Sequence, residues 1–242
     1  MTAAIAPAPV LMQVASLAKR YGDQRALTDI SFTVNAGEVL GLIGPNGAGK
    51  TTLMEAIAGT LATDAGQILW RGTPLPLPRR REFLFYLPDG VRPWEDQYVA
   101  RVIELFAAIY GRSQAFLAQT IHALGLAPVL GKRVVELSKG YARRLLLALA
   151  LLTPQPLLLM DEPFDGFDLR QTRDIMHVLR EVAGEGRTLV LAIHQLRDAA
   201  RVCDRFVLLA EGRIRGTGTL AQLQAQAGKP AADLEEIFLA LT

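Results

Sequence analysis

The segment Gly44–Thr51, with the sequence GPNGAGKT, has the spacing of glycine, lysine and hydroxyl residues that is typical of a phosphate-binding loop. Glycines at these positions let backbone N–H groups turn toward phosphate oxygens, which a Cβ atom would obstruct. Lys50 is expected to reach the terminal phosphates of a nucleotide, and the Thr51 hydroxyl to complete the shell of a Mg²⁺ ion. We therefore predict that the chain binds ATP and Mg²⁺. The residues of this segment expected to contact the nucleotide are Gly44, Asn46, Gly47, Gly49, Lys50, Thr51 and Thr52.

Two acids, Asp161 and Glu162, directly follow the apolar run Leu157–Met160. An apolar strand that ends in acids places carboxylates at the carboxyl edge of a parallel sheet, where ligands bind in such folds. We expect Asp161 to hold the Mg²⁺ shell and Glu162 to accept a proton from the attacking water. Two acids alone could be the polar end of a buried strand. Together with the phosphate-binding loop and Lys50, they predict an ATPase site.

The elements that must position these residues follow from the apolar periodicity of the chain. Strands are expected at 10–17, 27–34, 38–43, 66–71, 83–87, 157–160, 188–193, 206–210 and 213–216, the last two as a hairpin around 211–212. Helices are expected at 49–58, 97–110, 113–124, 141–152, 169–183 and 195–202. Three prolines between residues 72 and 80 predict an extended loop there.

The order of these elements indicates an α/β fold with a helical insert. Strands alternate with helices on both sides of the region 94–152, which has helical periodicity and no strand pattern. Alternation of this kind favours a mostly parallel sheet wrapped by helices. We assign residues 8–87 and 154–242 to the ATP-binding core and residues 88–153 to an inserted helical subdomain.

Five further motifs occur in a fixed order along the chain. The segment Leu137–Tyr141, LSKGY, resembles the LSGGQ signature of ABC transporter ATP-binding subunits, and Gly166–Asp168 resembles their D-loop. His194 stands at the position of the switch histidine, and Tyr21 at that of the aromatic residue that stacks on adenine. Tyr86–Asp89 occupies the position of the Q-loop. On these motifs the whole chain resembles the ATP-binding subunit of an ABC transporter.

This resemblance implies a fold and further site residues. The fold would be a P-loop NTPase (RecA-like) core with an N-terminal antiparallel β subdomain and the inserted helical subdomain. His194 would act in catalysis with Glu162 and Lys50, and Tyr21 would bind the nucleotide. Two further sets of residues are implied by the family pattern: nucleotide contacts from Ser138, Gly140 and Asp168, and a metal contact from Asp89.

The resemblance also implies two protein partners. Ser138 and Gly140 begin a helix, and a helix N-terminus with a hydroxyl group is a second anion site. In the family this site serves the ATP of a second ATP-binding subunit, packed head-to-tail as a homodimer or a related heterodimer. A separate transmembrane permease subunit is expected to dock on the helical subdomain, near Asp89–Tyr98. Trp94 and Tyr98 are expected to line this groove or to pack in the core.

The sequence departs from the family pattern at three positions. Lys139 and Tyr141 replace a glycine and a glutamine of the signature. Backbone N–H groups and the serine hydroxyl supply much of the signature contact, so Lys139 is compatible with it. Asp89 replaces a glutamine or glutamate and is shorter than either. It is expected either to contact the metal or to form a turn with Gly90.

Composition excludes several other classes. The 26 basic and 24 acidic residues give a net charge of +2, which does not indicate a nucleic-acid-binding protein. The single cysteine allows no internal disulfide. The first ten residues have no basic start, so we expect no signal peptide and a cytoplasmic location, on the membrane face where the permease lies.

Two alternatives to a transporter motor remain at this point. One is a soluble ABC ATPase that acts on nucleic acid or the ribosome, although such proteins usually have tandem nucleotide domains, long coiled coils or zinc modules. The other is a small-molecule kinase or a GTPase, although the chain has no Asn-Lys-x-Asp sequence. The C-terminal segment 234–241 favours a motor of the exporter type.

Overall fold

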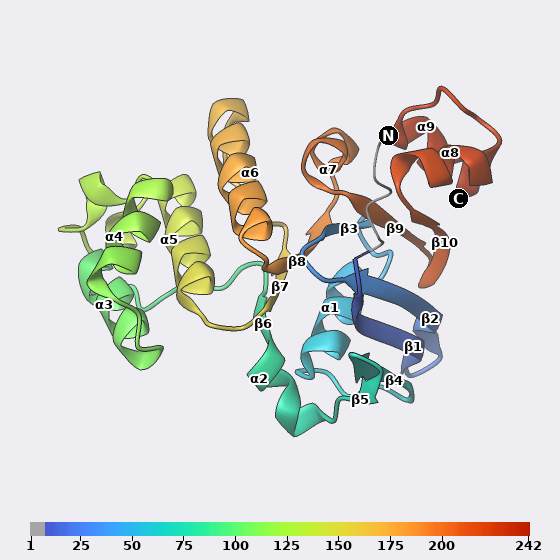
Figure 1. Ribbon diagram of the computed structural model, residues 1–242, viewed down its shortest axis with the longest axis horizontal. Helices are drawn as coiled ribbons and strands as arrows, with labels where there is room; N and C mark the ends of the chain where they lie inside the picture. The colour runs from blue at the N-terminus through green and yellow to red at the C-terminus, as the bar shows by residue number, and fades with distance from the viewer. Residues whose placement is uncertain (1–7) are drawn as a thin grey trace, which may run out of the picture.

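A computed structural model describes residues 8–242 of the chain, which form two β-sheets and surrounding helices (Figure 1). The strands are β1 Val10–Tyr21, β2 Gln24–Asn35, β3 Val39–Ile43, β4 Ala65–Trp70, β5 Thr73–Pro74, β6 Leu84–Leu87, β7 Leu157–Asp161, β8 Thr188–Ile193, β9 Arg205–Ala210 and β10 Arg213–Gly218. The α-helices are α1 Lys50–Ala58, α2 Arg80–Phe83, α3 Val99–Ile109, α4 Gln114–Ala123, α5 Lys139–Leu152, α6 Leu169–Gly184, α7 Leu196–Val202, α8 Leu220–Ala227 and α9 Leu234–Leu241.

The central sheet has the strand order β10-β9-β3-β8-β7-β6. All its neighbouring strands pair in parallel except β9 and β10, which form the predicted antiparallel hairpin. Every residue of β3, β7 and β8 is buried, as expected for parallel strands covered on both faces. The carboxyl ends of β3, β7 and β8 therefore meet at one edge of the sheet, where the predicted site residues follow them.

Alternate residues of the central strands pack into two separate cores. In β3, Val39 and Ile43 pack with apolar residues of α5, α6 and α7, whereas Leu40 and Leu42 pack with α1 and the second sheet. Leu53, Met54 and Ile57 of α1 are fully buried between the two sheets. The helix that follows the phosphate-binding loop is thus fixed by apolar packing on two sides.

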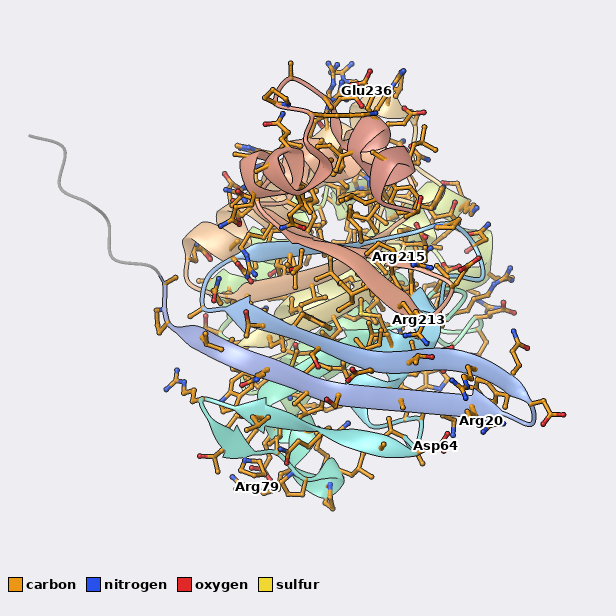
Figure 2. The ribbon with its side chains drawn as sticks, turned by 90° about the vertical axis from the view of Figure 1, so that its right-hand side faces the viewer. Arg20, Asp64, Arg79, Arg213, Arg215 and Glu236 are labelled. Atoms are coloured by element: carbon orange, nitrogen blue, oxygen red, sulfur yellow. The ribbon has the colours of Figure 1, made fainter. Side chains whose placement is uncertain are left out.

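The second sheet is antiparallel, with the order β2-β1-β4-β5, and its long strands β1 and β2 cross the face shown in Figure 2. At the far end of β1 the N–H of Arg20 donates to the Asp64 carboxylate at 2.7 Å, and the two residues lie together in this view. The Nζ of Lys19 lies 3.6 Å from the same carboxylate. These contacts fix the end of β1 at Tyr21.

The chain between β6 and β7 contains α3, α4 and α5, which lie to one side of the sheets (Figure 1). From Leu145 to Leu152 every residue of α5 is buried, because α3 and α4 cover one side of this helix and the core covers the other. Ser138 caps α5, with its hydroxyl accepting a hydrogen bond from the N–H of Tyr141 at 3.4 Å.

The expectation of an extended loop at 72–80 is wrong over most of its length. Thr73–Pro74 pairs with β4, and a 3₁₀ turn at Leu77–Arg79 leads into α2. A proline in the first turn does not disturb a helix, because its missing N–H has no partner there. The buried Arg80 then donates to the carbonyl oxygens of Ala56 and Ile57, which end α1.

The sequence also contains a helix signal that our prediction missed. Thr219 and Gln222 form a capping box at the start of α8, with the Thr219 N–H donating to Gln222 and the Gln222 N–H to Thr219. The same arrangement of Asp233 and Glu236 begins α9. In both cases the sequence contains the pattern that predicts a helix start, which is a cap residue followed three positions later by an acid or an amide.

Within residues 8–242, no helix is long and apolar enough to cross a membrane. Residues 1–7, on which the prediction of an absent signal peptide mainly rests, lie outside the described part of the chain.

Candidate nucleotide site

The phosphate-binding loop connects the end of β3, at Ile43, to the start of α1, at Lys50. Gly47 and Gly49 have φ angles of 82° and 103°, a left-handed conformation that favours glycine. A Cβ atom on Gly44 would lie 2.2 Å from the backbone oxygen of Leu209, so this position admits no side chain. Local backbone conformation and the close approach of β9 therefore both require the glycines of the motif.

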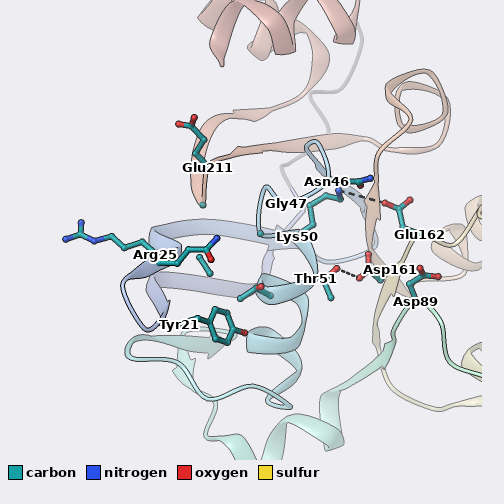
Figure 3. Close-up of a pocket in the computed structure, with 15 residues that line it drawn as sticks. Tyr21, Arg25, Asn46, Gly47, Lys50, Thr51, Asp89, Asp161, Glu162 and Glu211 are labelled. Carbon is teal, nitrogen blue, oxygen red and sulfur yellow. Dashed lines mark hydrogen bonds and ion pairs between the residues drawn. The ribbon is translucent and has the colours of Figure 1, made fainter.

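The Lys50 side chain reaches back over this loop. Its Nζ donates to the carbonyl oxygens of Gly44 at 2.8 Å and Pro45 at 3.3 Å, and the residue is only 6% exposed. The same ammonium lies 3.9 Å from Oε1 of Glu162 (Figure 3). A positive charge is thus held at the centre of the loop, where phosphate groups would lie.

Thr51 and Asp161, each expected to bind Mg²⁺, contact each other at the edge of the central sheet. The Thr51 hydroxyl donates to Oδ2 of Asp161 at 2.7 Å, and Asp161 is 2% exposed. Burial raises the pKa of the Asp161 carboxyl above its usual range, partly opposed by the Thr51 hydrogen bond and the charge of Lys50. Burial disfavours the negative charge of the carboxylate, and a bound cation would compensate that charge. The hydroxyl and the carboxylate therefore fit a Mg²⁺ ion, which takes oxygen ligands from protein side chains and from substrate phosphates.

Glu162 is oriented by its backbone and by His194. Its φ angle of 49° is left-handed, and its N–H donates to the Ala192 carbonyl at 3.0 Å. Oε2 of Glu162 lies 2.6 Å from Nδ1 of His194, the residue that follows β8. The neighbouring parallel strands β7 and β8 thus place a carboxylate and an imidazole in contact. A carboxylate in this position can accept a proton from water.

These residues surround a hollow of about 600 Å³ (Figure 3). Tyr21, which is 49% exposed, lines the hollow at the end of β1, on the side away from Asp161. An exposed aromatic ring that lines the same hollow as the phosphate-binding loop suits a nucleotide base. Among the predicted site residues, the structure places in the wall of the hollow Tyr21, Asn46, Gly47, Gly49, Lys50, Thr51, Thr52, Asp89, Asp161 and Glu162.

Part of this wall was not predicted from the sequence. Gln24, Arg25 and Ala26 at the start of β2, and Glu211 and Gly212 in the β9–β10 turn, also line the hollow. The hairpin signal at Glu211-Gly212 was visible. Its place in the site depends on the parallel pairing of β9 with β3, which brings both carboxyl ends together.

Four predicted nucleotide contacts, Gly44, Ser138, Gly140 and Asp168, do not line this hollow, and neither does the predicted catalytic residue His194. Ser138 and Gly140 lie at the start of α5, and a Cβ atom on Gly140 would lie 3.5 Å from the Gly166 carbonyl oxygen. The Asp168 carboxylate caps α6 by accepting a hydrogen bond from the Gln171 N–H at 2.8 Å. The signature-like and D-loop-like segments are therefore neighbours, and their contact with a nucleotide remains a prediction.

Asp89 lines the hollow and has a partner in the helical block. Its Oδ1 accepts a hydrogen bond from Nη2 of Arg143 at 2.5 Å. The Asp89 carboxylate therefore contacts helix α5 of the helical block. Its role as a metal ligand remains a prediction.

The sheet order, the phosphate-binding loop and the acidic edge define a P-loop nucleotide-binding domain. A family model described as ABC transporter matches residues 27–165 of the chain. Because this match covers more than half of the 242 residues, the chain belongs to the ABC transporter family of ATP-binding proteins.

Relatives and solved structures agree with this assignment. The chain is 36% identical over 205 residues to Nod factor export ATP-binding protein I of Rhizobium etli, an alignment that covers 81% of this chain and 64% of the relative. The protein of the same name from Paraburkholderia xenovorans is 35% identical over 91% of this chain and 74% of its own length.

Among solved structures, an ATP-binding subunit of an ABC transporter superposes with a TM-score of 0.87 at 32% identity, covering 96% of this chain and 99% of that one. A bacterial Atm1-family ABC exporter with ATP bound gives a TM-score of 0.80 at 25% identity, covering 98% of this chain and 44% of the exporter. The predicted fold class is confirmed.

Proposed function

We propose that the chain is the ATP-hydrolysing motor subunit of an ABC transporter and that it powers export through a separate transmembrane partner. The observation that supports this proposal most directly is the convergence of Lys50, the Thr51–Asp161 pair and Glu162 on one hollow, with His194 in contact with the Glu162 carboxylate from behind its wall.

Each of these residues has a distinct task in this proposal. Lys50 and the backbone N–H groups of the loop bind the phosphates, and Thr51 and Asp161 hold Mg²⁺. The bound ion would neutralise charge on the phosphate oxygens. Glu162 takes a proton from the attacking water, while His194 fixes the orientation of its carboxylate.

A second ATP-binding subunit completes the proposed motor. Ser138 and Gly140 lie outside the hollow of their own chain, yet they form the capped N-terminus of the long helix α5. A head-to-tail pair of subunits would bring each such helix end to the ATP of the other subunit, and this C2 arrangement closes on itself. The pair is either a homodimer or a heterodimer with a related subunit.

The membrane partner is proposed to dock where the core meets the helical block, on the cytoplasmic face of the membrane. A hollow of about 560 Å³ lies there, lined by Ala58 at the end of α1, Tyr86 of β6, Pro88 just after β6, and Tyr110 after α3. Trp94 and Tyr98, expected to line the docking groove, do not line this hollow, but their exposed fractions of 58% and 48% leave both side chains accessible on the helical block. Export is favoured by the names of similar proteins, which include Nod factor export proteins and an Atm1-family exporter.

Purification of the tagged chain from its native membranes tests this proposal. We expect a multi-spanning membrane protein to co-purify and the ATPase activity to require Mg²⁺. Salt-dependent binding of DNA or RNA with stimulation of ATP hydrolysis, and no membrane partner, would support the soluble alternative instead.

A further inference from the structure

A buried arginine of α5 contacts the wall of the nucleotide hollow from the helical side. Arg143 lies in the second turn of α5, and its side chain is 6% exposed. Its Nη2 donates to Oδ1 of Asp89, whose side chain remains 49% exposed. Asp89 in turn lies beside Asp161 in the hollow (Figure 3). A single ion pair therefore connects the helix that begins at Ser138 to the expected metal edge.

The charges around this pair indicate why the guanidinium is there. Asp89 and Asp161 both line the nucleotide hollow, so two carboxylates lie at the same edge. Arg143 brings a positive charge to this edge through its contact with Asp89. The Nη1 atom of Arg143 is buried and has no hydrogen-bond partner among the described residues. Burying such a guanidinium costs free energy, so its presence here indicates a need for its charge.

Two other cations of α5 also pair with acids of the core. Comparison with them shows which property is particular to Arg143. Lys139 contacts Asp165 at 2.9 Å, and Arg144 lies 4.0 Å from Asp174 on α6. Neither of these acids lines the nucleotide hollow. Among these three cations, only Arg143 pairs with an acid that lines the nucleotide hollow, and its side chain is the most buried of the three.

We propose that Arg143 is a positioning residue for ATP hydrolysis, because it holds the Asp89 carboxylate at the metal edge of the nucleotide hollow. The inference rests on the proposed function and deepens it. An aspartate at this position has a shorter reach than the glutamine or glutamate of the family pattern. Anchoring by Arg143 fixes the direction of this short side chain and makes it move with α5.

The test compares Arg143→Met, Asp89→Ala and the double variant, with Arg143→Lys as the conservative substitution. Arg144→Met is the matched control, since it removes a neighbouring arginine of the same helix whose acidic partner lies outside the hollow. Circular dichroism and thermal unfolding first establish that each variant is folded. Steady-state hydrolysis then gives kcat and KM, and titration with a fluorescent ATP analogue gives binding in EDTA and as a function of Mg²⁺ concentration.

We expect Arg143→Met and Asp89→Ala each to lower kcat about tenfold with less than a threefold change in KM, as for an interaction that matters mainly in the transition state. The double variant should lose no more than about twofold beyond the worse single variant, since both substitutions remove one interaction. Arg143→Lys should recover most of the loss. The Mg²⁺ midpoint for nucleotide binding should rise about threefold in Arg143→Met, with binding in EDTA unchanged.

Losses that multiply in the double variant would overturn the proposal, as would an equal loss of kcat in Arg144→Met or an unchanged Mg²⁺ midpoint in Arg143→Met. Absence of hydrolysis by the wild-type chain would instead count against the proposed function. The Mg²⁺ titration still decides the role of Arg143 in that case, because it needs only nucleotide binding.

Discussion

Nδ1 of His194 lies 2.6 Å from Oε2 of Glu162, and the two residues follow neighbouring parallel strands, β8 and β7. The other oxygen of the same carboxylate lies 3.9 Å from Nζ of Lys50. Glu162 is therefore held between two nitrogen atoms at the mouth of the phosphate-binding loop, although its left-handed backbone is an unfavourable one for glutamate. This arrangement places the carboxylate of the proposed proton acceptor beside the ammonium group of Lys50.

Glu162→Gln should retain ATP binding and lose hydrolysis by about 10²- to 10⁴-fold, because an amide cannot accept the proton of the attacking water. Calorimetry should give an ATP dissociation constant within about threefold of wild type, since Lys50 and the loop are intact. The closed pair of subunits should accumulate on size-exclusion chromatography with ATP. Turnover at the wild-type rate would rule out Glu162 as the base.

His194→Ala should lower kcat by about 10- to 100-fold, since it removes the group that orients the Glu162 carboxylate and leaves the carboxylate itself in place. His177→Ala is the control, because His177 lies on the exposed surface of α6 and contacts only Glu181 among charged partners described. Hydrolysis should be unchanged in the control. Equal rates for His194→Ala and wild type would contradict the positioning role.

Asp161→Asn should abolish the Mg²⁺ dependence of nucleotide binding while stabilising the nucleotide-free protein at neutral pH. The pKa of Asp161 is raised by burial, so the folded protein binds this proton more tightly than the unfolded chain does. The stabilising contribution of the protonated carboxyl is present below the usual aspartate pKa and is lost as pH rises through the raised value.

Urea unfolding of both proteins without nucleotide, between about pH 4 and pH 8, checks this sign. The free energy of unfolding of wild type should fall relative to that of Asp161→Asn as the pH rises. A difference that stays constant over this range would show that the Asp161 charge is not strained in the folded protein.

Gly44→Ala should destabilise the protein by roughly 2–4 kcal/mol, because its Cβ atom would overlap a backbone oxygen that cannot move aside. Gly184→Ala offers the comparison. A Cβ atom at Gly184, at the end of α6, meets no atom within 4 Å, so alanine should stabilise by up to about 1 kcal/mol. Chemical denaturation measures both, and a tolerant Gly44 would contradict the close approach of Leu209.

Much of the site could be predicted because its residues are adjacent in sequence to the elements that position them. Lys50 and Thr51 open the helix that follows their loop, and Asp161 and Glu162 end a buried strand. Sequence periodicity therefore placed each group at the correct end of its element. The place of Asp161 and Glu162 at the edge of the sheet followed from the rule that ligands bind at the carboxyl ends of parallel strands.

The remainder depends on pairings that a single sequence does not encode locally. Glu211 joins the hollow only because β9 lies beside β3, and Asp89 faces Arg143 only because α5 packs against the start of the helical block. The error at 72–80 has a different cause. The prolines predict an extended loop, whereas Pro78 lies in the first turn of a 3₁₀ helix, where it is tolerated.

The turn between β9 and β10 has a consequence for the order in which the protein can become functional. The N–H of Gly212 donates to the carbonyl of Ala48 in the phosphate-binding loop, and its own carbonyl accepts from the N–H of Thr28 on β2. Gly44 also rests against Leu209 on β9. A ribosome that has made the entire GPNGAGKT motif has therefore not yet made the strand that shapes it. The phosphate-binding loop can therefore take the described conformation only after the chain has been made as far as residue 212.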